Sequence, residues 1–165
     1  MSKRIRAGAA RRGFSLIELL IVMAIILIII TMAVPQYNKV MMHTRETAAL
    51  EAIGTIHKME TMYQSQYRRY AKTLQELGPP ANGVDSGPAA AGLIGNDLAS
   101  GENNGYKFKV SERPGGYSVT ATPIAYGSSG MTSYYSDETM VIREFHGKGD
   151  ATESSPEMGT AQDQK

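Results

Sequence analysis

A single carboxylate, Glu18, lies within the long apolar run that extends over residues 14–34. At 1.5 Å of rise per residue, a helix over this run matches the roughly 30 Å hydrocarbon core of a membrane. An ionised carboxylate at such a depth costs about 2.5–3.5 kcal/mol unless it is paired or lies near an interface. Glu18 therefore needs a partner, and pairing with a cation is the first chemistry that this sequence suggests.

Basic residues precede the apolar run. The first 12 positions contain no acidic residue and five basic ones, Lys3, Arg4, Arg6, Arg11 and Arg12. This asymmetry favours a cytoplasmic N-terminus. A single transmembrane anchor is one interpretation of the segment, and a secretory signal cleaved before Val34 is another. Neither interpretation accounts for Glu18.

The residues around Glu18 resemble the processing site of type IV prepilins and the related pseudopilins. Gly13-Phe14-Ser15-Leu16-Ile17-Glu18 follows a short basic leader, and Pro35 is at about the 22nd position counted from Phe14. The resemblance is specific over residues 8–40 and architectural beyond them. It implies that a prepilin peptidase cuts between Gly13 and Phe14, discards leader residues 1–13 and leaves a Phe14 amine that is N-methylated.

Such a cleavage would create a cation at Phe14 that can pair with Glu18 of a neighbouring subunit. In a medium of low dielectric constant, the paired state is favoured over two isolated charges. We interpret Glu18 as a registry residue for assembly, because the pairing favours one axial stagger. The implied partners are other copies of this chain, the prepilin peptidase, and the pilus or secretion assembly machinery in the inner membrane.

The chain is predicted to have an α+β fold of the type IV pilin kind, in which a long kinked N-terminal helix packs on a small antiparallel sheet. Residues 14–34 would form the membrane and filament-core half of the helix. Residues 35–77 would form an amphipathic half, because apolar residues from Ala49 to Tyr63 recur at spacings of 3, 4 or 7. Pro35 lacks a backbone N–H and is expected to kink the helix near the membrane surface.

The remaining segments are predicted from turn residues and alternation. Gly78-Pro79-Pro80 predicts the helix end and the start of an irregular αβ loop over residues 78–105. The resemblance makes residues 79–104 of this loop an interface candidate. Apolar and polar residues then alternate within residues 106–146, which predicts three or four antiparallel strands that include 133–135 and 140–142. Residues 147–165 are polar and predict a flexible tail.

Cofactor and metal chemistry have little support. The chain has no Cys, which excludes disulfides and thiolate chemistry. His43, His57 and His146 lack metal-ligand spacing, and a solvated or helix-face role is expected for each. The resemblance to the major pseudopilins of type II secretion, which bind calcium in a C-terminal loop, makes Asp137 and Glu138 a calcium candidate. Two adjacent acids are weak evidence for it, since calcium takes six to eight oxygen ligands and a plain β-turn is the alternative. We expect no cofactor.

The sequence therefore predicts a structural subunit and no enzyme, since no constellation of acid, base and nucleophile is recognisable. Basic and acidic residues number 17 and 16, so no global field attracts nucleic acid. The predicted function is that of a pilin, anchored in the inner membrane with an extracytoplasmic head and then assembled into a cell-surface type IV pilus. The alternatives are a pseudopilin of a type II secretion system and an unprocessed single-pass protein with an extracytoplasmic binding head.

Overall fold

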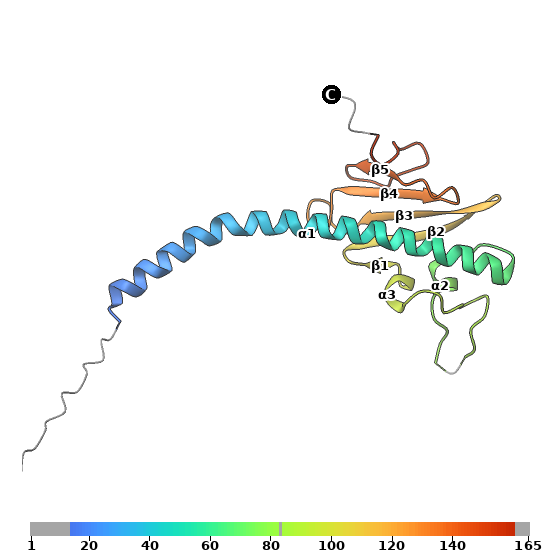
Figure 1. Cartoon of the computed structure of the whole chain (residues 1–165), viewed down its shortest axis with the longest axis horizontal. Helices are drawn as coiled ribbons and strands as arrows, with labels where there is room; N and C mark the ends of the chain where they lie inside the picture. The colour runs from blue at the N-terminus through green and yellow to red at the C-terminus, as the bar shows by residue number, and fades with distance from the viewer. Residues whose placement is uncertain (1–13, 83, 161–165) are drawn as a thin grey trace, which may run out of the picture. The chain divides into compact units, whose positions relative to one another are not determined.

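The computed structural model describes residues 14–82 and 84–160 of the chain (Figure 1). Two compact units divide at Tyr37, and we call residues 14–37 the stem and the described residues from 38 onward the head. The elements are α1 (Leu16–Tyr67), α2 (Leu74–Leu77), α3 (Asn96–Ala99), β1 (Glu102–Asn103), β2 (Tyr106–Arg113), β3 (Gly116–Pro123), β4 (Thr132–Asp137) and β5 (Arg143–His146).

The stem is helical from Leu16, and its apolar side chains are exposed as far as Val34. By length and composition, α1 is apolar enough to cross a membrane. Exposure of so much apolar surface to water is unfavourable in free energy, so this surface requires lipid or other apolar helices around it. The helical assignment continues through position 35, and the kink expected at Pro35 stays a prediction.

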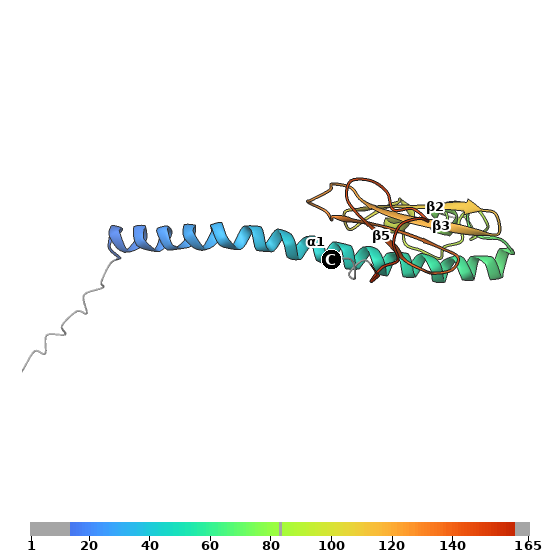
Figure 2. The ribbon, with the colours of Figure 1, turned by 90° about the horizontal axis from the view of Figure 1, so that it is seen from above.

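The head consists of one sheet packed on the second half of α1. Its five strands follow one another in the order β1-β2-β3-β4-β5, and every neighbouring pair is antiparallel. Figure 2 shows this sheet lying along the helix. The α+β fold predicted from the sequence is confirmed, with five strands where three or four were expected.

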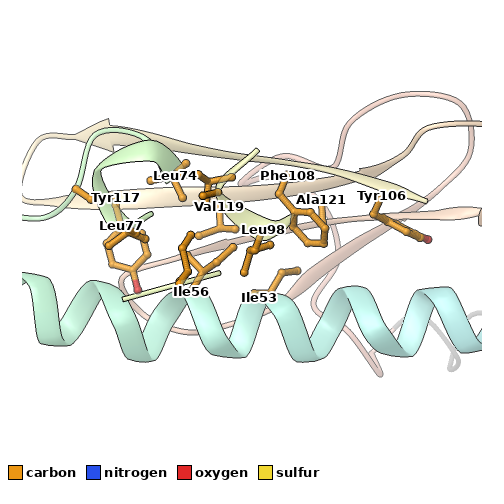
Figure 3. Close-up of a cluster of buried hydrophobic side chains, with 14 of the residues drawn as sticks. Ile53, Ile56, Leu74, Leu77, Leu98, Tyr106, Phe108, Tyr117, Val119 and Ala121 are labelled. Atoms are coloured by element: carbon orange, nitrogen blue, oxygen red, sulfur yellow. The ribbon is translucent and has the colours of Figure 1, made fainter. Parts of the chain in front are cut away.

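Apolar side chains from α1 and the sheet form the core. Figure 3 shows Ile53 and Ile56 rising from α1 toward the sheet side chains, among them Phe108 and Val119. Alternation places Tyr106, Phe108 and Val110 on this face, and each is at most 4% exposed. Burying a side chain of this size contributes about 1.5–3 kcal/mol, so this interface holds the sheet on the helix.

The helix ends earlier than its sequence predicts. We expected it to reach residue 77, but α1 stops at Tyr67, where Arg68 adopts a left-handed φ of 60°. Residues 68–73, which we call the return segment, then lead back to the short helix α2. Ala71 in this segment is fully buried, so packing of the return segment against the core outweighs continuation of the helix.

Two further predictions are corrected at the C-terminal end of the sheet. A strand was expected over 140–142, but Met140 has a φ of 63° and its N–H donates to Asp137 O, which makes a turn. The strand β5 begins at Arg143 instead.

Residues 147–160, predicted as part of a flexible tail, form a strap on the sheet. Pro156 O accepts the Glu144 N–H at 2.9 Å, and the Met158 N–H donates to Ile142 O at 2.8 Å. Ala151 is 2% exposed. The strap forms hydrogen bonds with backbone groups at the edge of the sheet. A polar segment can make such bonds, so its composition did not require it to be flexible. Residues 161–165 lie outside the described residues.

Candidate functional site at the start of the stem helix

Ser15 is the residue that begins α1. The Leu19 N–H donates to Ser15 O at 3.3 Å, which is the first hydrogen bond of the helix, and Leu16 is the first helical residue. Ser15 therefore occupies the N-cap position, and Glu18 is the third residue of the helix. This spacing, serine followed three residues later by glutamate, is the capping-box pattern.

Glu18 makes the contact that this pattern predicts. Its Oε2 accepts the backbone N–H of Ser15 at 2.8 Å. A carboxylate at this position satisfies one of the donors left open at a helix start and interacts favourably with the positive end of the helix dipole. The charge in the apolar run thus has a partner within its own chain.

The same carboxylate can also accept a second donor. No side chain or backbone group in the described part of the chain donates to Glu18 Oε1 at hydrogen-bond distance. Phe14, four residues earlier, is 88% exposed. Gly13 and the basic leader lie outside the described residues, so the cleavage site itself stays a prediction. The geometry leaves one carboxylate oxygen available for a cation from another molecule.

The capping role of Glu18 was not predicted from the sequence. The signal was present, because Ser15 and Glu18 have capping-box spacing immediately before an apolar run. The sequence interpretation treated Glu18 only as the partner of an amine on a neighbouring subunit. Both interpretations can hold, since a carboxylate has two oxygens and about four acceptor positions.

The two calcium candidates, Asp137 and Glu138, differ in exposure and in their contacts. Asp137 is buried at the end of β4, where its Oδ1 accepts the Thr139 N–H at 3.0 Å and its Oδ2 lies 3.3 Å from Arg113 Nη1. Burial alone would raise the pKa of Asp137, but the Thr139 hydrogen bonds and the Arg113 charge outweigh it and lower that pKa. Glu138 is exposed. Calcium would have to compete with Arg113 and Thr139, and the site stays a prediction.

One of the three histidines is part of the core, which corrects the expected solvated or helix-face role. His57 is 5% exposed, and its Nδ1 lies 2.5 Å from Tyr117 Oη while its Nε2 lies 2.8 Å from Ser136 Oγ. Ser136 Oγ donates its hydrogen to Val141 O, so it must accept from Nε2–H, and Nδ1 then accepts from Tyr117. Burial lowers the pKa of His57 against the opposing effect of the Asp137 charge.

This serine and histidine pair is structural. Ser136 is fully buried, so a substrate cannot reach its hydroxyl. The network instead joins α1 to β3 and β4. The sequence signal for it was positional, because His57 directly follows Ile56 and lies four residues after Ile53 on the apolar stripe of α1.

The outer face of the sheet contains a shallow groove of about 540 Å³. It is lined by Glu102, Lys107, Lys109, Thr120, Thr122, Pro123, Ile124 and Asp150. Thr122 Oγ1 donates to Asp150 Oδ1 at 2.6 Å. Two lysines are balanced by two carboxylates, so the groove has no excess charge that would attract a polyanion.

Comparisons with known proteins identify a family motif at the N-terminal end of the chain and one partial relative. The family model described as the prokaryotic N-terminal methylation motif matches residues 8–34, which include Gly13, Phe14 and Glu18. The type IV major pilin protein PilA of Myxococcus xanthus (strain DK1622) is 33% identical over 73 residues. This match covers 44% of the chain and 33% of the length of that relative. No solved structure matches the chain.

These findings confirm the resemblance that the sequence suggested. The chain carries the prokaryotic N-terminal methylation motif, and over part of its length it is similar to a type IV major pilin. The Ser15 and Glu18 cap lies within the matched residues, so the helix cap and the family motif occupy the same segment.

Proposed function

We propose that the chain is a pilin, a structural subunit that a prepilin peptidase cuts between Gly13 and Phe14 and that then assembles into a type IV pilus. The observation that supports this proposal best is the placement of Glu18. It is the one charged side chain of an apolar, exposed segment, it lies in the first helical turn, and it uses only Oε2 for an intrachain contact. A structural membrane anchor would need no such residue.

Assembly would use Glu18 twice. In the single subunit, the carboxylate accepts from its own Ser15 N–H, which lowers the cost of holding a charge near the membrane. In the filament, the cationic amine of Phe14 on a neighbouring copy would bind the same carboxylate while the apolar stems pack together. Because the amine carries a charge, this pairing is stronger than the bond to a neutral backbone donor.

The proposed location follows from the same segment. Before assembly the subunit would span the inner membrane once, with the basic leader in the cytoplasm and the head outside it. After assembly it would form part of a filament on the cell surface, with the stems in the filament core. The peptidase and the assembly machinery would be its partners. Its role is structural, and no reaction is assigned to the head.

A pseudopilin of a type II secretion system is the alternative within this class. The processing motif fits it equally well. We favour the pilus because the composition around Asp137 and Glu138 lacks a clear calcium loop of the kind that resembling major pseudopilins carry.

Intact-mass and N-terminal analysis of the chain from its native membrane and from sheared surface material tests this proposal. A start at methylated Phe14 in both fractions is the expected result. A start at Val34 would identify a secreted protein, and retention of residues 1–13 would identify an ordinary membrane anchor. Either of these would overturn the proposal. Recovery of the processed chain from membranes but never from surface filaments would favour the secretion pseudopilin.

A further inference from the structure

Glu60 is a buried carboxyl group with too few hydrogen-bond donors. It lies on the core-facing side of α1 and is fully buried. Its Oε2 accepts the Ala71 N–H at 2.9 Å, whereas its Oε1 has no hydrogen-bond partner within residues 14–82 and 84–160. A buried carboxylate is normally stabilised by several donors or by a cation. One backbone N–H does not meet that need.

The cation that acts on Glu60, Arg69, is already paired with another carboxylate. Arg69 Nη1 lies 2.6 Å from Glu76 Oε2, and this carboxylate also accepts the Lys72 N–H at 3.2 Å. Arg69 and Glu76 therefore largely cancel each other at Glu60. Tyr63 of α1 also donates to Glu76 Oε2, at 3.0 Å. On the sheet side, the Glu60 charge acts on Tyr117 of β3, which contacts Tyr70 of the return segment and His57 of α1, and Asp137 of β4 acts on both Tyr117 and His57.

None of these groups favours a charged Glu60. His57 is neutral and engaged with Tyr117 and Ser136, and Asp137 is itself an anion. Burial raises the pKa of Glu60 to about 7, against the lowering effects of the Ala71 N–H and the Arg69 charge. The carboxyl is therefore protonated in mildly acidic solution and loses its proton near neutral pH.

The Glu60 contact holds the segment on which the following loop depends. Ala71 lies in the return segment that leads into α2. The α2 backbone in turn accepts hydrogen bonds from the loop, from Ala91 N to Glu76 O and from Leu93 N to Leu77 O, both at 2.8 Å. Release of Ala71 would therefore loosen α2 and the part of the αβ loop docked on it.

We propose that Glu60 and Ala71 form a proton-operated latch, in which the protonated carboxyl keeps the return segment and α2 docked on α1 and loss of the proton to solvent frees them. An ionised Glu60 needs water, and the return segment is the covering element that can yield, because the side chains of Arg69 and Lys72 are 38% and 53% exposed. The latch is a property of the head and does not depend on filament assembly.

The latch predicts a specific dependence on pH. If opening exposes Glu60 to water and returns its pKa from about 7 to 4.5, the opening equilibrium constant rises nearly tenfold per pH unit between about pH 5 and 7. It levels off above pH 7, where both the closed and the open forms are ionised. The total increase is roughly 300-fold.

Hydrogen exchange of the Ala71 amide in the full chain in detergent micelles tests the proposal. The measured rate, divided by the intrinsic rate at each pH from 5 to 8, gives the opening constant. We expect a steep rise up to pH 7 and a plateau above it. Glu60→Gln should abolish the rise. Glu51→Gln, which changes an exposed carboxyl on the same helix, should retain it. A ratio that is constant with pH in the unmodified chain would overturn the latch.

A second measurement does not rely on the Glu60→Gln variant being folded. The carboxyl carbon of Glu60 in the unmodified chain can be titrated by NMR. A midpoint near 7 is expected, and a midpoint near the ordinary value of 4.5 would show that the group is hydrated in the closed form and would overturn the latch. The latch would also be overturned if the opening constant of the Ala71 amide still rose tenfold per pH unit in Glu60→Gln.

Discussion

Removal of the strap, residues 147–160, should destabilise the head although the segment is polar and irregular. Besides exposed contacts such as Thr122 to Asp150, a chain that ends at His146 loses three hydrogen bonds that hold the strap on the sheet, Glu144 N to Pro156 O, Met158 N to Ile142 O and Ser133 Oγ to Gly149 O. At about 1 kcal/mol each, these contribute about 3 kcal/mol. Ordering the strap costs entropy, so we expect a net loss of about 1–3 kcal/mol.

Thermal unfolding of the full chain in detergent, followed by the near-ultraviolet circular dichroism of the core tyrosines, measures this loss. For a chain of this size, 1–3 kcal/mol corresponds to a fall in Tm of roughly 3–10 °C. A chain that ends at Thr160 is the matched control, because it keeps every described contact of the strap. Equal Tm values for the two truncated chains would refute the docking of the strap and restore the flexible tail expected from composition.

A point substitution separates the strap contact from the loss of chain length. Ser133 is fully buried and donates to Gly149 O at 2.8 Å, so Ser133→Ala leaves that carbonyl without its donor. We expect a loss of about 1–2 kcal/mol. Ser118→Ala on β3 is the control, because no side-chain hydrogen bond of Ser118 joins it to the described residues. Equal stabilities of the two variants would contradict a strap held through Ser133.

Three further predictions concern the stem and the core. Ile56→Ala should cost about 2–5 kcal/mol in urea unfolding because Ile56 is fully buried, and a loss below 1 kcal/mol would contradict the packing. Glu60→Gln should be more stable than the unmodified chain, and the difference in unfolding free energy should grow to about 3 kcal/mol as pH rises from 4.5 to 7. The reason is that the folded form binds the Glu60 proton more tightly than the unfolded form does. A stability difference that does not change with pH would contradict the raised pKa of Glu60. Glu18→Ala should abolish surface filaments and leave processing at Phe14 intact, whereas Glu51→Ala should assemble normally.

Local patterns predicted the elements that depend on local physics. The alternation of Tyr106, Phe108 and Val110 indicated a strand, and β2 pairs with β3 as the expected hairpin. The apolar run ahead of Pro35 indicated the stem, because length and composition alone decide whether a helix can span a membrane. Glu18 was identified because a charge in such a run has a high cost.

Tertiary contacts decided the parts that were wrong. Gly78-Pro79-Pro80 is a strong local stop signal, yet α1 ends at Tyr67, since burial of Ala71 against the core compensates for a left-handed Arg68. Glu60 gave no signal of its own, because an acidic residue at a core position of a helix is rare and its donor lies eleven residues later in the chain.

The C-terminal strand shows the same limit. Met140-Val141-Ile142 has the composition of a strand, whereas the observed strand, Arg143–His146, is mostly polar. A polar strand is stable here because β4 pairs with one edge and the strap supplies hydrogen bonds around the other. This chain has no cysteine, so hydrogen bonds and packing hold this region in place of a disulfide. The composition of a segment does not reveal a hydrogen-bond partner that lies elsewhere in the chain.

The two roles of Glu18 can be separated by one substitution. Ser15→Pro removes the backbone N–H that donates to Glu18 Oε2 but keeps the carboxylate itself. Mass analysis must first show that the Ser15→Pro chain is cleaved before Phe14. If pairing with the Phe14 amine of a neighbour drives assembly, this processed chain should still form filaments. Ser15→Ala is the control, because it keeps the N–H and loses only the hydroxyl. A processed Ser15→Pro chain that fails to assemble, as Glu18→Ala is expected to fail, would mean that the carboxylate is required for the helix cap. In that case a neighbouring amine would not be the partner that Glu18 needs.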